Sequence, residues 1–365
     1  MLREELSAVL GFSAGHHEEA PLNRKNIGLG ALTLALGRLA LEAADRRRAV
    51  NLRGATAVVC GASRGLGRGI ALELARRGVA KIGICARTEH DLDSVASELV
   101  SRGVFVCAEQ CDLSKPEEVE RFLGSTCARL GPIDLLVTNA ATITVGPAAS
   151  WTKEDFDEAM GSIFYTALNP ILGVLPGMRQ RRRGTIALVT SIGARIGVPH
   201  LAPYCAAKFA TMGLAESLRA ELAQDGVHVL AAVPGLMRTG SHVHAEFKGN
   251  HDLEYAWFGA SAMAPIISID ADRAARRIVS AIARGRVEVA FTPEARLAPI
   301  ARSLAPRIWA EAMALAARML PRPPVASADG GVRREGVDIE RTSESLAVKA
   351  VHERGKRAVE KHAQS

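Results

Sequence analysis

Residues 56–67 read TAVVCGASRGLG, a run of small and β-branched residues that passes directly into a glycine-rich turn. The apolar run favours a β-strand. The glycines permit a tight turn and a close approach of the backbone to a pyrophosphate, and a following helix, about Leu66 to Arg77, would point its positive N-terminus at that charge. A glycine-rich turn alone is a weak signal, but this one follows a strand and opens a helix. We therefore predict a dinucleotide site here, with a plain strand-to-helix turn as the alternative.

Similar apolar runs recur after this turn, at intervals that leave room for a helix between each pair. They cover residues 81–86, 104–108, 133–138, 185–191, 227–233 and 287–291. Continuous apolar strands that alternate with helices are typical of a parallel sheet covered on both faces. The sequence predicts an α/β fold with a single doubly wound parallel sheet of about seven strands, Rossmann-like, over residues 54–292.

Composition excludes some classes of protein. The 46 Lys and Arg residues exceed the 39 Asp and Glu residues by seven, but they are spread along the chain. The tight run Arg181–Arg183 is interpreted as a solvated helix end, and no zinc-finger or RNA-binding motif accompanies it. We therefore expect no nucleic-acid partner. The six cysteines form no CxxC and no metal-ligand spacing with histidine, which favours a reducing, cytoplasmic location and no metal site.

Residues 1–53 form an N-terminal extension with a predicted apolar helix over 27–44. Its apolar run, Ile27–Leu41, is interrupted by Arg38 and followed by Arg46, Arg47 and Arg48. Fifteen residues fall short of the about 20 that a spanning helix requires. Two interpretations lead: the helix packs on protein, in the domain or in a homo-oligomer, or it is a membrane-surface or marginally spanning anchor; disorder is the third alternative.

The C-terminal part divides into two stretches. Residues 293–320 are predicted to be a helical extension, because leucine, isoleucine and methionine recur there at helical spacing, and Pro306 should kink or split it. Its apolar side suits either a dimer face or a membrane-surface helix. Residues 321–365 begin with PRPP and are charged and rich in Gly, Ser and Ala, so we expect them to be mostly disordered.

Three residues are the candidates for proton chemistry. Tyr204 and Lys208 stand at positions i and i+4 at the start of a helix and share one face. An ammonium beside a phenol favours the phenolate, so we expect the pKa of Tyr204 to be lowered and the residue to act as a general acid and base. Ser191 ends the fifth strand, at the carboxyl edge where ligands bind such sheets, and its hydroxyl could hold a carbonyl oxygen.

These residues appear in order with the glycine turn, Asn139–Ala140, Pro234–Gly235 and Thr239. The set closely resembles the short-chain dehydrogenase/reductase family over about residues 54–292. The resemblance implies that Tyr204 is the acid/base, that Lys208 also holds the nicotinamide ribose and that Ser191 positions the carbonyl. The implied cofactor site comprises Gly61, Ser63, Arg64, Gly65, Leu66, Gly67, Arg87, Asp112, Asn139, Tyr204, Lys208, Pro234, Gly235 and Thr239. Within it, Asp112 would contact the adenine side, Asn139 line the cleft and Thr239 meet the carboxamide.

The second strand ends at Ala86–Arg87, where an NAD site usually offers an acidic residue to the ribose. Arg87 and Arg64 could instead bind a 2′-phosphate bidentately, which predicts NADP(H) as cofactor. Residues 240–267 resemble the family's variable substrate lid and contain several aromatic residues. These indicate a bulky, apolar small-molecule substrate, unless they merely pack the lid on the core.

The sequence departs from the family pattern mainly at Ile163, where an Asn that supports a proton relay is usual. Isoleucine cannot relay protons, so either another group such as Thr166 completes the relay, or turnover is slow or lost. The leading hypothesis is an NADP(H)-dependent oxidoreductase that interconverts a carbonyl and a secondary alcohol by hydride transfer. The alternative is a nucleotide-binding regulatory or scaffold protein with weak or lost catalysis.

Overall fold

The structure is a computed structural model that describes residues 42–43, 45, 48–264, 268–322 and 331–362. The chain divides into two compact units, residues 1–47 and residues 48–365. The predicted apolar helix over 27–44 lies almost entirely outside the described residues, so its two interpretations stay predictions. The fold described below is that of the second unit.

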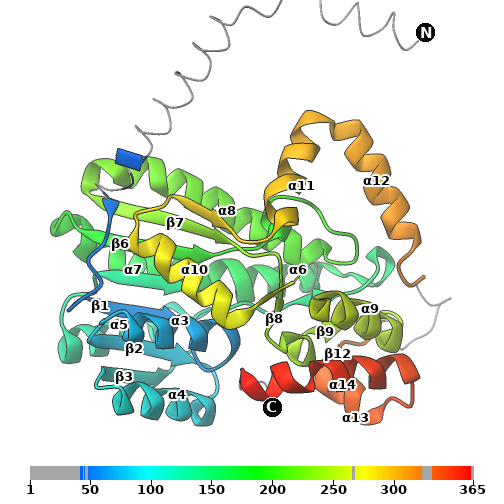
Figure 1. Cartoon of the computed structure of the whole chain (residues 1–365), viewed down its shortest axis with the longest axis horizontal. Coiled ribbons are helices and arrows are strands. Elements are labelled where there is room, and N and C mark those ends of the chain that lie inside the picture. Colours follow the sequence, from blue (N-terminus) through cyan, green and yellow to red (C-terminus); the bar gives the residue numbers. More distant parts are fainter. Residues whose placement is uncertain (1–41, 44, 46–47, 265–267, 323–330, 363–365) are drawn as a thin grey trace, which may run out of the picture. The chain divides into compact units, whose positions relative to one another are not determined.

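A seven-stranded parallel sheet forms the centre of this unit, in the order β11-β7-β6-β4-β1-β2-β3 (Figure 1). The strands are β1 (Thr56–Cys60), β2 (Lys81–Ala86), β3 (Phe105–Gln110), β4 (Leu135–Thr138), β6 (Gly184–Val189), β7 (Val227–Val233) and β11 (Glu288–Ala290). The strand order reverses between β1 and β4, and ligands bind such sheets at the carboxyl ends of the strands on either side of this switch point. The predicted doubly wound fold is confirmed.

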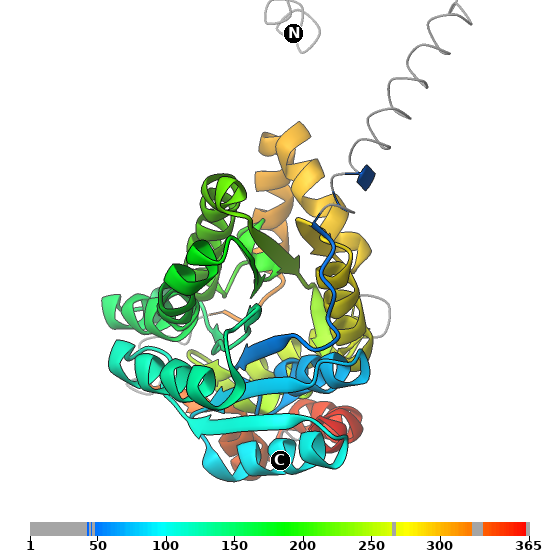
Figure 2. The same ribbon diagram turned by 90° about the vertical axis from the view of Figure 1, so that its left-hand side faces the viewer.

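Helices cover both faces of the sheet, as the end-on view shows (Figure 2). Val59 of β1 faces a core shared with α3 (Gly65–Arg76), α4 (Glu89–Ser101) and α10 (Ala271–Ala283). Val58, its neighbour in the chain, faces the opposite core, shared with α5 (Pro116–Leu130), α7 (Thr166–Gln180) and α8 (Ala202–Leu222). Both residues are fully buried, which is why the strand reads as a continuous apolar run rather than an alternating one.

One helical stretch, Lys153–Gln180, is long and apolar enough to cross a membrane when judged by length and composition alone. It consists of α6 (Lys153–Ala159), a π-helical turn (Met160–Tyr165) and α7. Its α7 part packs on α5 and its α6 part on α8. It is therefore a core helix of the α/β domain.

A smaller layer lies beyond the carboxyl edge of the sheet. It contains two short sheets, one of β8 (Leu236–Arg238) and β10 (Ser268–Asp270), the other of β5 (Thr144–Val145), β9 (Glu246–Phe247) and β12 (Arg334–Glu335). Its helices are α9 (His251–Met263), α13 (Gly336–Thr342) and α14 (Leu346–Lys361). Residues 265–267, at the end of the predicted lid, lie outside the described residues.

The expectation that residues 321–365 are mostly disordered is wrong for residues 331–362, which form β12, α13 and α14. Helix α14 buries Val348, Val351 and Gly355, three and four residues apart, against α9. Ile339 of α13 joins the same apolar cluster. The expectation rested on the average composition of the segment, which is charged. An average composition does not show that the few apolar residues share one face of a helix.

Helices α11 (Pro293–Leu304) and α12 (Pro306–Arg318) connect the domain to this C-terminal segment. Pro306 opens the second helix, so the predicted helical extension is split there, with Ala305 as the only residue between the two helices. The pair projects from the body of the unit as a V-shaped hairpin (Figure 1).

Candidate active site

A cavity of about 870 Å³ opens at the carboxyl edge of the sheet, between the ends of β1 and β4 and the smaller layer. Its lining contains every predicted catalytic and cofactor-binding residue except Gly67. The structure therefore brings together residues that are up to 178 positions apart in the chain, from Gly61 to Thr239. This cavity is called the cleft below.

The glycine-rich turn is held against β4 by contacts that allow no larger residue. Gly61 has φ +74°, and a Cβ on it would stand 2.8 Å from the backbone of Ala140. Gly67 lies behind the turn, where a Cβ would stand 1.9 Å from the carbonyl oxygen of Gly61. Asn139 donates a hydrogen bond from Nδ2 to that same oxygen, at 3.0 Å. Gly67 and Asn139 therefore shape the cleft by fixing the turn.

The turn also receives contacts from the smaller layer, which the sequence did not predict. The backbone N–H of Gly65 donates to the carbonyl oxygen of His362, at 2.8 Å, at the end of α14. The Arg64 guanidinium is 2.9 Å from Nε2 of His244. The C-terminal helix thus ends directly on the predicted phosphate-binding turn.

The groups at the adenine end of the cleft are mostly charged. Arg87 is exposed beside the cleft at the end of β2. Burial lowers the pKa of Arg64, and the neighbouring Arg87 charge acts in the same direction. Burial opposes ionisation of Asp112, but hydrogen bonds from the hydroxyl and the N–H of Ser114, at 2.7 and 3.0 Å, prevail and lower the pKa of its carboxyl group. Two cations and one fixed anion are therefore available to a ligand here.

The three candidate reacting residues lie together at the other end of the cleft. The side chains of Ser191 and Tyr204 both line the cleft, and a hydrogen-bond interaction with Ser191 lowers the pKa of the phenol. The Lys208 ammonium is 5.7 Å from the centre of the Tyr204 ring, and it donates to the carbonyl oxygen of Val189 at 3.2 Å. The serine orientation is fixed in turn by the N–H of Gly193, which donates to Oγ at 3.1 Å.

The expected lowering of the Tyr204 pKa is not found. Desolvation of the phenol raises its pKa to about 12, although the Ser191 bond acts in the opposite direction. Burial likewise lowers the pKa of Lys208 to about 8. The expectation counted only the attraction between ammonium and phenolate and omitted the cost of removing both groups from water.

Ile163, the main departure from the family pattern, stands in the π-helical turn and is only 2% exposed. It packs against Ala207 and Tyr204. Two polar residues near it, Ser162 and Thr166, line the cleft. The Thr166 hydroxyl is within hydrogen-bonding distance of the carbonyl oxygens of Ala140, Ser162 and Ile163, at 3.3, 2.9 and 3.1 Å. The suggestion that Thr166 completes a proton relay stays a prediction.

The predicted lid serves both of the purposes left open by the sequence. Trp257 and Phe258 of α9 line the cleft. Tyr255 instead packs between His242 and Phe247, with ring centres 5.7 and 5.5 Å away. Aromatic residues of the same helix therefore contribute both to the cleft wall and to the core of the smaller layer.

Sequence reasoning missed several polar residues of the cleft, among them Arg333 and Glu335 in the segment expected to be disordered. Arg333 and Glu335, in and beside β12, line the cleft. Arg333 forms ion pairs with Asp155 at 2.6 Å, with Glu246 at 3.0 Å and with Glu158. No local sequence signal marks them, because their partners are about 90 to 180 positions away along the chain.

Sequence reasoning also missed Glu294, which lines the cleft, and Thr292, which does not; both lie beside Gly235. A Cβ on Gly235 would stand 2.3 Å from the Thr292 hydroxyl and 2.4 Å from a Glu294 carboxylate oxygen. Both oxygens are buried and have no hydrogen-bond partner among the described residues. This wall of the cleft therefore offers unsatisfied polar atoms, and a ligand group with donors would satisfy them.

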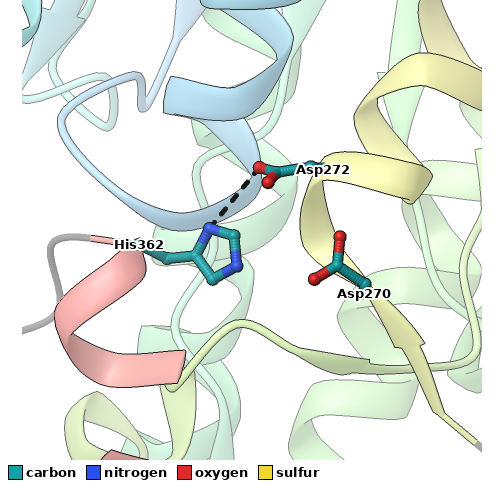
Figure 3. Close-up of side chains that lie close together, drawn as sticks. All are labelled: Asp270, Asp272 and His362. Carbon is teal, nitrogen blue, oxygen red and sulfur yellow. Dashed lines mark ion pairs between the residues drawn. The ribbon is translucent and has the colours of Figure 1, made fainter. Parts of the chain in front are cut away.

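One cluster outside the cleft has the composition of a metal site. Asp270, Asp272 and His362 point toward one another from α10 and the end of α14, with ligand atoms within 4.8 Å (Figure 3). However, the Lys361 ammonium already pairs with both carboxylates, at 3.1 and 2.7 Å, and Asp270 also caps α10 by accepting from the N–H of Arg273. The cluster is better explained as the ion-pair network that fastens the end of α14.

Comparison with known proteins agrees with this geometry. The profile of the short chain dehydrogenase family matches residues 55–247. A 3-oxoacyl-[acyl-carrier-protein] reductase of Staphylococcus epidermidis is 32% identical over 182 residues, which cover 50% of this chain and 75% of the relative. An NADPH-dependent pterin aldehyde reductase of Arabidopsis thaliana is 35% identical over 186 residues, with 50% and 75% covered.

Among solved structures, a short-chain dehydrogenase from Streptomyces avermitilis superimposes with a TM-score of 0.63, over 73% of this chain and 98% of that one, at 23% identity. The superposition supports the fold alone. The profile match covers more than half of the chain, including the glycine turn, Ser191, Tyr204 and Lys208. The chain therefore belongs to the short-chain dehydrogenase family, whose members are oxidoreductases acting on CH–OH and C=O groups with NAD(P)(H).

Proposed function

We propose that this protein is an NADP(H)-dependent carbonyl reductase or alcohol dehydrogenase for a bulky, apolar small molecule, with Tyr204 as the general acid and base. The observation that carries the proposal is that Tyr204, Ser191 and Lys208 line one cleft with the glycine turn, with the Lys208 ammonium 5.7 Å from the centre of the Tyr204 ring. None of these residues is distinctive alone, whereas their meeting in one cavity defines a site for proton transfer.

The residues present fit such a cofactor. The glycine turn leaves space that any Cβ would fill, and the N-terminus of α3 favours a pyrophosphate above it. Arg64 and Arg87 stand where a 2′-phosphate would be bound, and no acidic residue ends β2. The unsatisfied oxygens of Thr292 and Glu294 beside Gly235 suit the amide hydrogens of a carboxamide.

When bound, the nicotinamide supplies or accepts the hydride. In carbonyl reduction, Ser191 holds the substrate oxygen and Tyr204 donates its hydroxyl proton to that oxygen as the C–H bond forms. The protonated Lys208 stabilises the negative charge that develops on the phenol oxygen. Trp257 and Phe258 close the cleft on the substrate side and exclude water from the reacting groups.

A turnover panel tests the proposal. Purified protein is assayed for NADPH oxidation with long-chain ketones, aromatic aldehydes and a 3-oxoacyl thioester, the last two chosen for the chemistry named in the two relatives. We expect turnover with at least one compound. We also expect Tyr204→Phe to reduce kcat by about 10²–10⁴-fold without changing NADPH affinity, because only the proton donor is removed. Equal kcat in the variant would contradict the mechanism.

Cofactor preference is tested in the same assay. Arg87→Ala should lower kcat/KM for NADPH by about tenfold or more and leave that for NADH nearly unchanged, because a charge-assisted phosphate contact is lost. Arg102→Ala is the matched control, since Arg102 pairs with Glu98 away from the cleft. A wild-type preference for NADH would overturn the NADP(H) assignment.

The alternative, a nucleotide-binding regulatory or scaffold protein, is favoured by one observation, the buried Ile163 against Tyr204. It predicts NADPH binding with no turnover on the whole panel.

A further inference from the structure

The hairpin of α11 and α12 carries a concentration of exposed apolar side chains. Six of its large apolar residues are between 54% and 84% exposed, namely Leu297, Ile300, Leu304, Ile308, Leu315 and Met319. Other exposed large apolar side chains of the described residues come from separate elements, such as Val100 of α4 and Phe105 of β3. Large contiguous apolar patches are uncommon on soluble monomers and mark interaction sites.

These residues form stripes rather than a random scatter. On α11, Leu297, Ile300 and Leu304 are spaced three and four residues apart. On α12, Ile308, Leu315 and Met319 are spaced seven and four apart. Each spacing places its residues on one side of a helix. Both helices are therefore amphipathic, with the apolar side turned outward.

No described part of the chain covers the stripes. No residue of α12 is buried, and the main packing partner of this helix is α11. Helix α11 is fixed to the domain on one side: Ala295 is buried, Arg296 donates to the carbonyl oxygen of Ala290 at 3.0 Å, and Arg302 donates to that of Arg195 at 2.8 Å. The hairpin is thus anchored at one end while its apolar side has no protein partner among the described residues.

The charges of the hairpin decide between the candidate partners. Its helices contain four arginines, at 296, 302, 307 and 318, and two glutamates, at 294 and 311, a net charge of +2. Arg296 and Arg302 are bonded to the domain and Glu294 lines the cleft, so the outer part of the hairpin has Arg307, Arg318 and Glu311, a net charge of +1. A second copy would bring the same arginines against one another, whereas an anionic surface complements them.

We propose that α11 and α12 form a docking surface for an anionic lipid bilayer, with the two apolar stripes inserted among the acyl chains and Arg307 and Arg318 at the headgroups. An outward apolar side with arginines on the flanks is the arrangement of interfacial helices. Long arginine side chains reach the headgroups from such a position.

Trp309 of α12 gives a readout that is local to the hairpin. Full-length protein is mixed with vesicles of phosphatidylcholine and phosphatidylglycerol that carry bromine on the acyl chains, and tryptophan quenching is measured. We expect quenching that is absent from Trp309→Phe. We also expect the full-length triple variant Ile308→Gln, Leu315→Gln, Met319→Gln to bind at least about tenfold more weakly, because three apolar side chains no longer transfer out of water.

The matched control replaces three exposed apolar residues elsewhere, Val100→Gln, Phe105→Gln and Leu346→Gln, and should leave quenching unchanged. Vesicles of phosphatidylcholine alone should bind much more weakly. If the Trp309 signal is unaffected by vesicles, or if sedimentation shows that the hairpin triple variant dissociates a dimer, the proposal is overturned. Any signal that persists equally in the triple variant also overturns it, since lipid contact would then lie outside the hairpin.

Discussion

At the scale of single residues, the reacting groups show how burial competes with charge attraction. Tyr204 keeps its proton up to a pKa of about 12, whereas Lys208 loses its proton near a pKa of about 8. The acid needed for carbonyl reduction is therefore available over the whole working range of pH. The Lys208 ammonium, in contrast, is lost above a pH of about 8. Its charge stabilises the phenolate that forms when Tyr204 donates its proton.

We therefore expect kcat/KM for carbonyl reduction to be constant below pH about 8 and to fall about tenfold per pH unit above it. The loss follows deprotonation of Lys208, since the tyrosine is still protonated there. Initial rates between pH 6 and pH 10 measure the profile, with Lys208→Arg for comparison. The variant keeps its charge, so any residual activity should not fall above pH 8. A profile that is flat to pH 10 in the wild type would contradict this assignment.

His242, which does not line the cleft, also has a pKa that is shifted by burial. Its side chain is fully buried, neither ring nitrogen has a hydrogen-bond partner among the described residues, and the nearest carboxylate, on Glu340, is 3.9 Å away. Burial lowers the pKa of His242 from 6.5 to about 4. The folded protein therefore holds this histidine neutral where the unfolded chain protonates it.

Because the folded pKa is the lower one, the unfolded state binds the extra proton between pH 6.5 and pH 4, and stability falls as pH decreases through that range. We expect the free energy of unfolding to drop by up to about 3 kcal/mol across it. Urea titrations at several pH values measure the drop. His242→Phe should remove that part of the dependence, while His90→Phe, at a highly exposed histidine, should not. An equal drop in both variants would refute the assignment.

At the scale of elements, a helix, strand or turn could be predicted from the sequence where the contacts that determine it are local. Strands β1, β2 and β7 have the predicted bounds. A strand that is buried on both faces of the sheet is apolar at nearly every position, so the apolar run itself marks where the strand begins and ends. The glycine turn could be predicted equally well, because Gly61 and Gly67 are required by contacts within the β1–α3 unit and with the residues that follow β4. Tyr204 and Lys208 share a helix face, so their pairing follows from spacing alone.

The smaller layer could not be predicted from the sequence, because the contacts that determine it join residues far apart in the chain. Arg333 is fixed by two carboxylates of α6, Asp155 and Glu158, and by Glu246 of β9, none of which lies near it in sequence. Helix α14 is stabilised by a narrow apolar stripe against α9 within a charged segment. Such elements are specified by long-range partners, which composition and periodicity over a short window do not reveal.

The end of α14 carries a prediction of this kind. Removal of residues 361–365 deletes the carbonyl group that accepts from Gly65 N–H and the ion pairs of Lys361 with Asp270 and Asp272. We expect NADPH affinity to fall by about fivefold, since one hydrogen bond that orients the turn is lost. Fluorescence titration measures the affinity. Lys361→Ala is the control, because it removes the ion pairs and keeps the backbone bond. Tighter NADPH binding in the truncated chain would show instead that the His362 carbonyl competes with phosphate.

At the scale of the whole molecule, three features bear on where the protein works. The chain is basic, the hairpin is amphipathic, and the N-terminal sequence contains the apolar run Ile27–Leu41 followed by arginines. Two weak lipid-binding segments in one chain bind a surface together much more tightly than either does alone, because the second contact becomes intramolecular. A run of fifteen residues that is interrupted by Arg38 still falls short of a stable span.

This combination gives the last prediction, on the full-length chain and on a chain that begins at Arg48, the start of the second compact unit. Expressed in cells, the full-length protein should sediment with membranes, resist a high-salt wash and be released by alkaline carbonate, because apolar insertion survives screening while interfacial attachment does not survive carbonate. The shortened protein, left with the hairpin alone, should be released by salt. Full solubility of both as monomers would refute membrane and oligomer docking together. Resistance of the full-length chain to carbonate would show that residues 27–41 span the bilayer, contrary to the length argument.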